Sequence, residues 1–115
     1  MTGRTILSVL AVAAVALGGS VSAQDAKLIE KGEKLYATSK CSTCHSVAGK
    51  GNKKGPLDEV GSKLKAEDIR QWLINPNEMT AKTKSTRKPF MSSYAKLPKE
   101  DIDALVAYML SLKKK

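Results

Sequence analysis

Residues 41–45 of the chain are Cys41-Ser42-Thr43-Cys44-His45, and most of its predicted chemistry depends on them. The 115-residue chain contains two cysteines and one histidine, and all three lie in this stretch. A C-x-x-C pair followed at once by histidine is typical of covalent haem attachment, in which both thiols form thioethers with haem vinyl groups and the imidazole reaches the iron. A helical turn at these residues would serve both tasks.

The same residues could instead form a zinc site, a redox-active disulfide or a structural disulfide. A structural zinc site needs four ligands, and one copy of this chain supplies only three cysteine and histidine side chains. A redox disulfide of the thioredoxin type lies near a β-α-β pattern, which this sequence does not contain. Haem attachment is therefore the interpretation that we favour.

Upstream of the motif, residues 1–23 have the pattern of a secretory signal peptide. Arg4 supplies the positive charge, residues 6–17 form an apolar stretch, and Val-Ser-Ala at residues 21–23 resembles a cleavage site. The apolar stretch has twelve residues, whereas a membrane span needs about 20. We expect cleavage after Ala23, a single mature domain over residues 24–115 in the periplasm, and no stable membrane insertion after cleavage.

The size and charge of the mature chain narrow its partners. Cleavage would leave 92 residues, a length at which an apolar core is thin and a buried cofactor adds what the side chains lack. Removing Arg4 lowers the formal net charge from +9 to +8, and two ionised haem propionates would lower it to about +6. Export and the dispersed lysines argue against nucleic acid. We expect a monomer that meets redox partner proteins with acidic docking surfaces.

The apolar pattern predicts an all-α fold. Helices are expected over residues 25–39 and 65–75, and most clearly from residue 98 to the C-terminal lysines, where acidic residues open an amphipathic stripe. Residues 49–61 are rich in glycine and lysine, and residues 77–94 are polar and basic without helical periodicity. Both are expected to be irregular loops. No strand-like alternation competes with the helices.

Residues 24–115 resemble a class I cytochrome c, with the haem motif near the N-terminus and a terminal helix closing the fold. The resemblance implies a cytochrome c fold of three to five helices around one covalently bound haem c, and an electron carrier that is not an enzyme. It also implies that Gly32 and Tyr36, with Tyr108 in the last helix, form the family's close crossing of terminal helices.

The resemblance extends to two further contacts around the haem. Gly55-Pro56-Leu57 resembles the family's G-P-x-L stretch, in which the proline carbonyl accepts a hydrogen bond from the free ring nitrogen of the proximal histidine. Residues 71–76 resemble the end of the family's third helix, where a tryptophan lies near the haem. Pro56 would thus orient His45, and Trp72 would reach a propionate.

His45 is the only histidine in the chain, so the second ligand must be methionine, lysine or water, or there is none. The resemblance implies methionine. Met79 and Met91 both lie in the expected loop over residues 77–94, and spacing alone permits either. Residues 88–94 resemble the family's ligand loop, which favours Met91. The sequence departs from the family at Ser92, because many relatives carry proline directly after the methionine.

These residues predict a periplasmic carrier that shuttles single electrons through one haem ligated by His45 and Met91. One alternative is the electron-accepting cytochrome subunit of a periplasmic dehydrogenase, which would have the same haem site. Another is a five-coordinate haem sensor or peroxidase, although no second histidine is present for peroxide chemistry. The lysines of the two expected loops would flank the exposed haem edge; they are Lys50, Lys53, Lys54, Lys82, Lys84 and Lys88.

Overall fold

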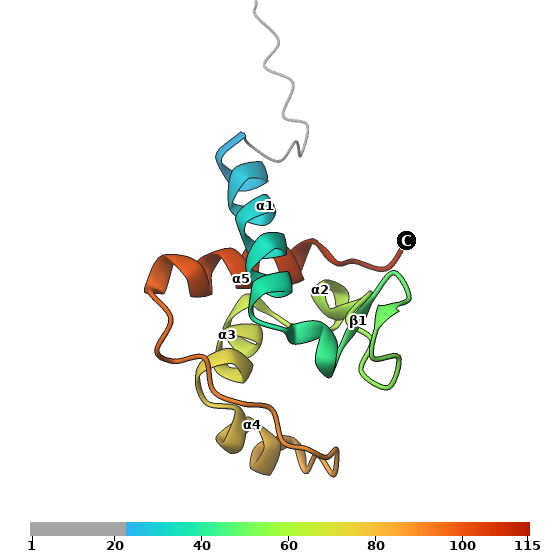
Figure 1. Cartoon of the computed structure of the whole chain (residues 1–115). Helices are drawn as coiled ribbons and strands as arrows, with labels where there is room; N and C mark the ends of the chain where they lie inside the picture. The colour runs from blue at the N-terminus through green and yellow to red at the C-terminus, as the bar shows by residue number, and fades with distance from the viewer. Residues whose placement is uncertain (1–22) are drawn as a thin grey trace, which may run out of the picture.

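The computed structural model describes residues 23–115 of the chain (Figure 1). Residues 1–22, which carry nearly all of the predicted signal peptide, lie outside the described residues, and the cleavage site stays a prediction. In chain order the elements are α1 (Ala23–Thr38), the 3₁₀ turn η1 (Cys41–Thr43), β1 (Ser46–Val47), β2 (Lys50–Gly51), α2 (Val60–Lys63), α3 (Ala66–Ile74), α4 (Pro76–Thr83) and α5 (Lys99–Ser111). The predicted helical fold is confirmed, with one very small hairpin in addition.

The crossing of α1 and α5 organises the molecule (Figure 1). A Cβ atom on Gly32 would overlap the Ala104 carbonyl and lie 2.6 Å from Tyr108 Cβ, so only glycine permits this approach. Beside it, the rings of Tyr36 and Tyr108 meet edge to face, with centroids 5.7 Å apart and planes at 63°. The crossing expected from Gly32, Tyr36 and Tyr108 is therefore confirmed.

The apolar core lies where α3 packs against α5. Ile69 and Leu73 of α3 are each 1% exposed, and Leu105 of α5 is fully buried. α5 begins after Pro98 with acidic residues in its first turn, as the sequence predicted. Its apolar stripe faces inward, and its buried members are Ile102, Ala104, Leu105, Val106, Tyr108 and Met109. None of the helices in residues 23–115 is both long and apolar enough to cross a membrane.

The prediction of an irregular loop over residues 77–94 is wrong in its first part, which forms α4. Pro76 follows α3 and also occupies the first turn of α4. Its fixed φ suits a helix there, and an N–H at this position would have no partner within the helix. Thr80 Oγ1 donates to the Pro76 carbonyl at 2.7 Å. Because the helix buries only Pro76 and Met79, it has no apolar stripe for the sequence to reveal.

The glycine-rich stretch over residues 49–61 is also more regular than predicted. β1 and β2 pair antiparallel, with Ser46 opposite Gly51, and the two residues between the strands have the positive φ values that such tight turns need. Further along, Gly61 of α2 lies so close to α5 that a Cβ atom would overlap the Leu110 carbonyl. Short-range turns thus fold this stretch against the last helix.

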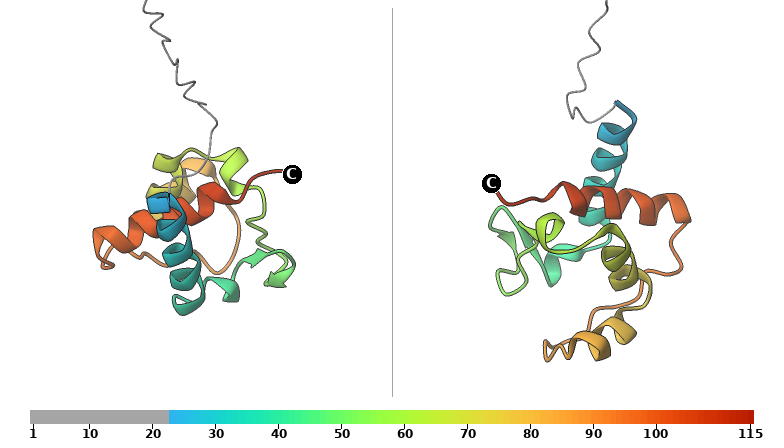
Figure 2. Two further views of the ribbon diagram at one scale, coloured as in Figure 1. Left: turned by 90° about the horizontal axis from the view of Figure 1, so that it is seen from above. Right: turned by 180° about the vertical axis from the view of Figure 1, so that it is seen from behind.

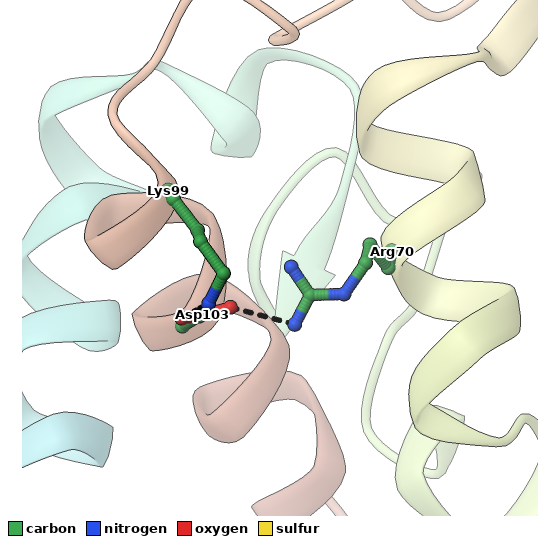
Figure 3. A network of polar contacts seen from close by, with 3 residues as sticks. All are labelled: Arg70, Lys99 and Asp103. Atoms are coloured by element: carbon green, nitrogen blue, oxygen red, sulfur yellow. Dashed lines mark hydrogen bonds and ion pairs between the residues drawn. The ribbon is translucent and has the colours of Figure 1, made fainter.

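A group of three charged side chains joins α3 to α5 (Figure 3). Asp103 accepts a hydrogen bond from Arg70 Nη2 at 2.7 Å and another from Lys99 Nζ at 2.8 Å. These bonds, from Lys99 first and then from Arg70, lower the pKa of the Asp103 carboxyl. A second ion pair joins α1 to α5, where Lys31 Nζ lies 3.0 Å from Asp101.

Replacing Gly32 tests the helix crossing. Alanine normally favours a helix over glycine by about 1 kcal/mol, but here its methyl group would force α1 and α5 apart. We expect Gly32→Ala to lower the free energy of unfolding by about 1–3 kcal/mol, measured by denaturant titration of the haem-loaded protein. Lys34→Ala, at an exposed position of α1, is the control, and a Gly32→Ala protein as stable as its parent would contradict the close packing.

Replacing Asp103 gives a pH-dependent prediction. Its pKa is lower in the folded chain, so its charge stabilises the fold above the unfolded pKa of about 3.9, and this contribution disappears as pH falls through the folded pKa. We expect Asp103→Asn to unfold more easily than the parent at pH 7 and equally easily near pH 2. Glu33→Gln, which removes another exposed carboxyl, should show no such pattern; an unfolding difference that persists at pH 2 would count against the ion pairs.

Candidate haem site

The C-x-x-C-H motif forms a tight turn directly after α1. Lys40 adopts a left-handed conformation with φ of 58°, which ends the α1 segment and starts η1. The His45 and Cys44 amides then both donate to the Cys41 carbonyl, at 2.9 and 3.1 Å. Cys41 is buried, Cys44 is half-buried, and both are free thiols. The expected helical turn at the motif is confirmed as one turn of 3₁₀ helix.

The His45 ring is oriented by one backbone oxygen. Its Nδ1 lies 3.1 Å from the Gly55 carbonyl, and because a carbonyl only accepts, Nδ1 carries the proton and Nε2 has a free lone pair. Burial lowers the pKa of His45, and the Arg87 guanidinium lowers it further, against the opposing effect of the Gly55 bond. The imidazole is therefore neutral at physiological pH, which is the form that binds metals.

The expected role of Pro56 belongs instead to the residue before it. Ser46 N donates to the Gly55 carbonyl at 3.0 Å, and Leu57 N donates back to the Ser46 carbonyl at 2.8 Å. This bridge turns the Gly55 oxygen toward the motif, so it is that oxygen, and not the one of Pro56, that His45 contacts. Pro56 itself is exposed.

Met91 lies on an extended segment over residues 85–94, which returns from α4 toward α5 and is called the Met91 segment below. It is half-buried and packs against the same apolar cluster that includes Cys41. Just beyond it, Ser93 Oγ donates to the Ile74 carbonyl at 3.0 Å, and Tyr94 N donates to the Leu73 carbonyl at 2.7 Å. These bonds fix the end of the Met91 segment on the last turn of α3.

Met79 and Trp72 are placed differently. Met79 is 7% exposed and forms part of α4, which lies at the opposite end of the molecule from the start of α1 (Figure 2). Trp72 is half-buried on α3. The structure therefore separates the two candidate methionines by backbone type, one in a helix and one in an extended segment.

Arg87 belongs to the site although the sequence pointed only to a basic loop. Its Nη2 donates a hydrogen bond to the Cys44 carbonyl, across 43 positions of sequence. A cavity of about 260 Å³ opens at this contact. It is lined by Thr43, Cys44, Asn52, Lys54, Arg87, Lys88 and Pro89. No local pattern could have identified Arg87, because its partner lies in another part of the chain.

The donor set of these residues fits a c-type haem. Two free thiols are available for covalent attachment, one neutral imidazole has a free nitrogen, and a thioether stands on a separate segment. Residues 29–113 match the protein-family model described as Cytochrome c. The chain belongs to the cytochrome c family. Membership confirms the resemblance and the fold, and it implies covalently bound haem c and haem-based electron transfer.

One curated relative is a subunit of a cytochrome c oxidase. Cytochrome c oxidase subunit 2 of Alkalihalophilus pseudofirmus is 26% identical to this cytochrome over 95 residues, with 75% of this chain and 26% of that protein covered. This chain thus spans about a quarter of the length of that relative. No solved structure matched the chain.

Proposed function

We propose that this cytochrome is a periplasmic electron carrier whose single haem is attached to Cys41 and Cys44 and ligated by His45 and Met91. The observation that carries the proposal is the fixed His45 ring, whose Nδ1 is held by Gly55 while Nε2 stays available. When bound, haem c supplies an iron that takes up and releases one electron. The pattern of residues 1–23 supports export.

The chain's own residues would make the site a carrier. His45 and Met91 would both bind the iron and so would leave no room there for a substrate. Ligation by a thioether together with an imidazole would favour the reduced state and raise the reduction potential. Trp72, half-buried on α3, would donate its indole N–H to a propionate.

Backbone geometry supports Met91 over Met79 as the sixth ligand. Met91 stands on an extended segment whose end is tied to α3, and it packs near the cluster that contains Cys41. Met79 is held inside α4, where the Met79 carbonyl accepts a hydrogen bond from Thr83 Oγ1 at 2.8 Å.

Six exposed lysines support docking to an acidic partner. Lys50, Lys53, Lys54, Lys82, Lys84 and Lys88 are all exposed. Lys54 and Lys88 line the cavity beside Cys44, and the ammonium of Lys88 lies 3.7 Å from the centre of the half-exposed Phe90 ring. A half-exposed apolar ring beside an ammonium group, on a surface with many lysines, suits a brief encounter between monomeric proteins that is steered by charge.

A second candidate is an electron-transfer subunit that stays bound to a larger enzyme. The likeness to part of a cytochrome c oxidase subunit 2 favours this candidate, because such a unit works inside an assembly. A periplasmic dehydrogenase subunit would use the same haem site. The two candidates differ in how long the partner stays bound, and the salt dependence of the interaction can distinguish them.

The optical spectrum tests the ligands. We expect the haem-loaded protein to show sharp low-spin bands when reduced and a far-red sulfur-to-iron band when oxidised. Met91→Leu should abolish the far-red band, whereas Met79→Leu, a swap of similar volume in the core, should keep it. Loss of the band in Met79→Leu alone would overturn our choice of ligand, and a high-spin parent that binds carbon monoxide would favour a sensor or peroxidase.

Salt dependence tests the carrier proposal. The assay mixes the reduced protein with membranes from the cells that make it and measures the rate of its oxidation. This rate should fall several-fold between about 10 and about 150 mM salt, because the Debye length shrinks from about 30 to about 8 Å. Replacing Lys54 and Lys88 together by Gln should mimic high salt, and replacing Lys27 and Lys65 should not. Co-elution with a large partner at high salt would instead favour the bound subunit.

A further inference from the structure

Arg87 connects two parts of the chain that the proposed function places on opposite sides of the haem. Its Nη2 donates to the carbonyl of Cys44, the residue directly before His45. Its side chain is half-buried, and its backbone amide is 3.5 Å from Ser85 Oγ within its own segment. The guanidinium thus connects the Met91 segment to the haem motif by a hydrogen bond.

The contact depends on a notch in the backbone at Gly55. A Cβ atom at Gly55 would overlap both terminal nitrogens of Arg87 and the Cys44 carbonyl. Gly55 is buried, and its own carbonyl accepts the His45 Nδ1–H. The guanidinium therefore lies against the two residues that determine the orientation of His45. Cys44 is joined to His45 by the peptide bond, and Gly55 accepts the hydrogen bond from its ring.

On the other side of the contact, Arg87 is four residues before Met91. Within the described part of the chain, Arg87 makes the only hydrogen bond from residues 86–92 to another element. The next anchors are Ser85, whose amide donates to Thr80, and Ser93, which donates to Ile74. Between those anchors, Arg87 alone ties the Met91 segment to the rest of the fold by a polar contact.

We propose that Arg87 is a positioning residue that holds the Met91 segment against the His45 turn and so resists release of Met91 from the iron. The inference rests on the proposed ligation by Met91. Arginine suits this role because it stays charged at all physiological pH values and presents planar, fixed donors to a carbonyl. A hydrogen bond from a charged donor is stronger than a neutral one, so its loss should be measurable.

Competition with imidazole tests the proposal in the oxidised, haem-loaded protein. Imidazole must displace Met91, and the far-red sulfur-to-iron band reports the displacement. We expect Arg87→Ala to bind imidazole about tenfold more tightly than the parent, the scale of one lost charged hydrogen bond. Arg87→Lys should fall between them, because lysine keeps the charge but not the planar donors.

Two control variants separate positioning from general stability and charge. Arg70→Ala breaks another arginine contact, the one to Asp103 between α3 and α5, and should unfold more easily without a change in imidazole affinity. Lys96→Gln removes an exposed positive charge from the same connecting segment and should also leave imidazole affinity unchanged.

Each remaining outcome decides the question. Imidazole affinity of Arg87→Ala equal to that of the parent, or a shift no larger than that of Arg70→Ala, would overturn the role of Arg87 and leave the carrier function standing. If Arg87→Ala does not load haem, Arg87→Lys decides in the same titration, and a parent-like affinity overturns the proposal. A parent without the far-red band would overturn ligation by Met91 itself, and the proposal with it.

Discussion

The hydrogen bond from His45 Nδ1 to the Gly55 carbonyl is the constraint around which the site is built. It requires the chain to turn back within ten residues, and the hairpin and the Ser46 bridge supply that turn. The residue that supplies this carbonyl also has no room for a side chain, because Arg87 and the Cys44 carbonyl occupy the space beside Gly55. Orientation of the imidazole thus accounts for the loop path, and the packing of Arg87 accounts for the glycine.

The helices supply a rigid support for this loop structure. α1 leads directly into the motif, and α1 is held by α5 through the contact at Gly32 and the paired rings of Tyr36 and Tyr108. Gly61 repeats the device on the other side of α5, where α2 approaches the Leu110 carbonyl. Because Gly32 and Gly61 have no side chains, α1 before the motif and α2 after it both pack closely on α5.

Local patterns made part of this predictable from the sequence. The C-x-x-C-H spacing located the turn, and acidic residues before an apolar stripe located α5. α4 was missed because it buries only two of its eight residues, so no periodicity appears. The partner of His45 was misplaced by one residue because the direction of a carbonyl depends on the Ser46 bridge, and Arg87 was missed because its partner is 43 residues away.

The chain order of these contacts has a consequence for how the two halves of the site assemble. The supports of His45 come from residues 41–57, so that half closes short loops at a small cost in chain entropy. The Met91 half also has contacts that span 43 and 55 residues, namely Arg87 with Cys44 and Tyr94 with Ser39. Contacts between distant residues form slowly. We therefore expect the turn that carries Cys41, Cys44 and His45 to form before these long-range contacts of the Met91 half.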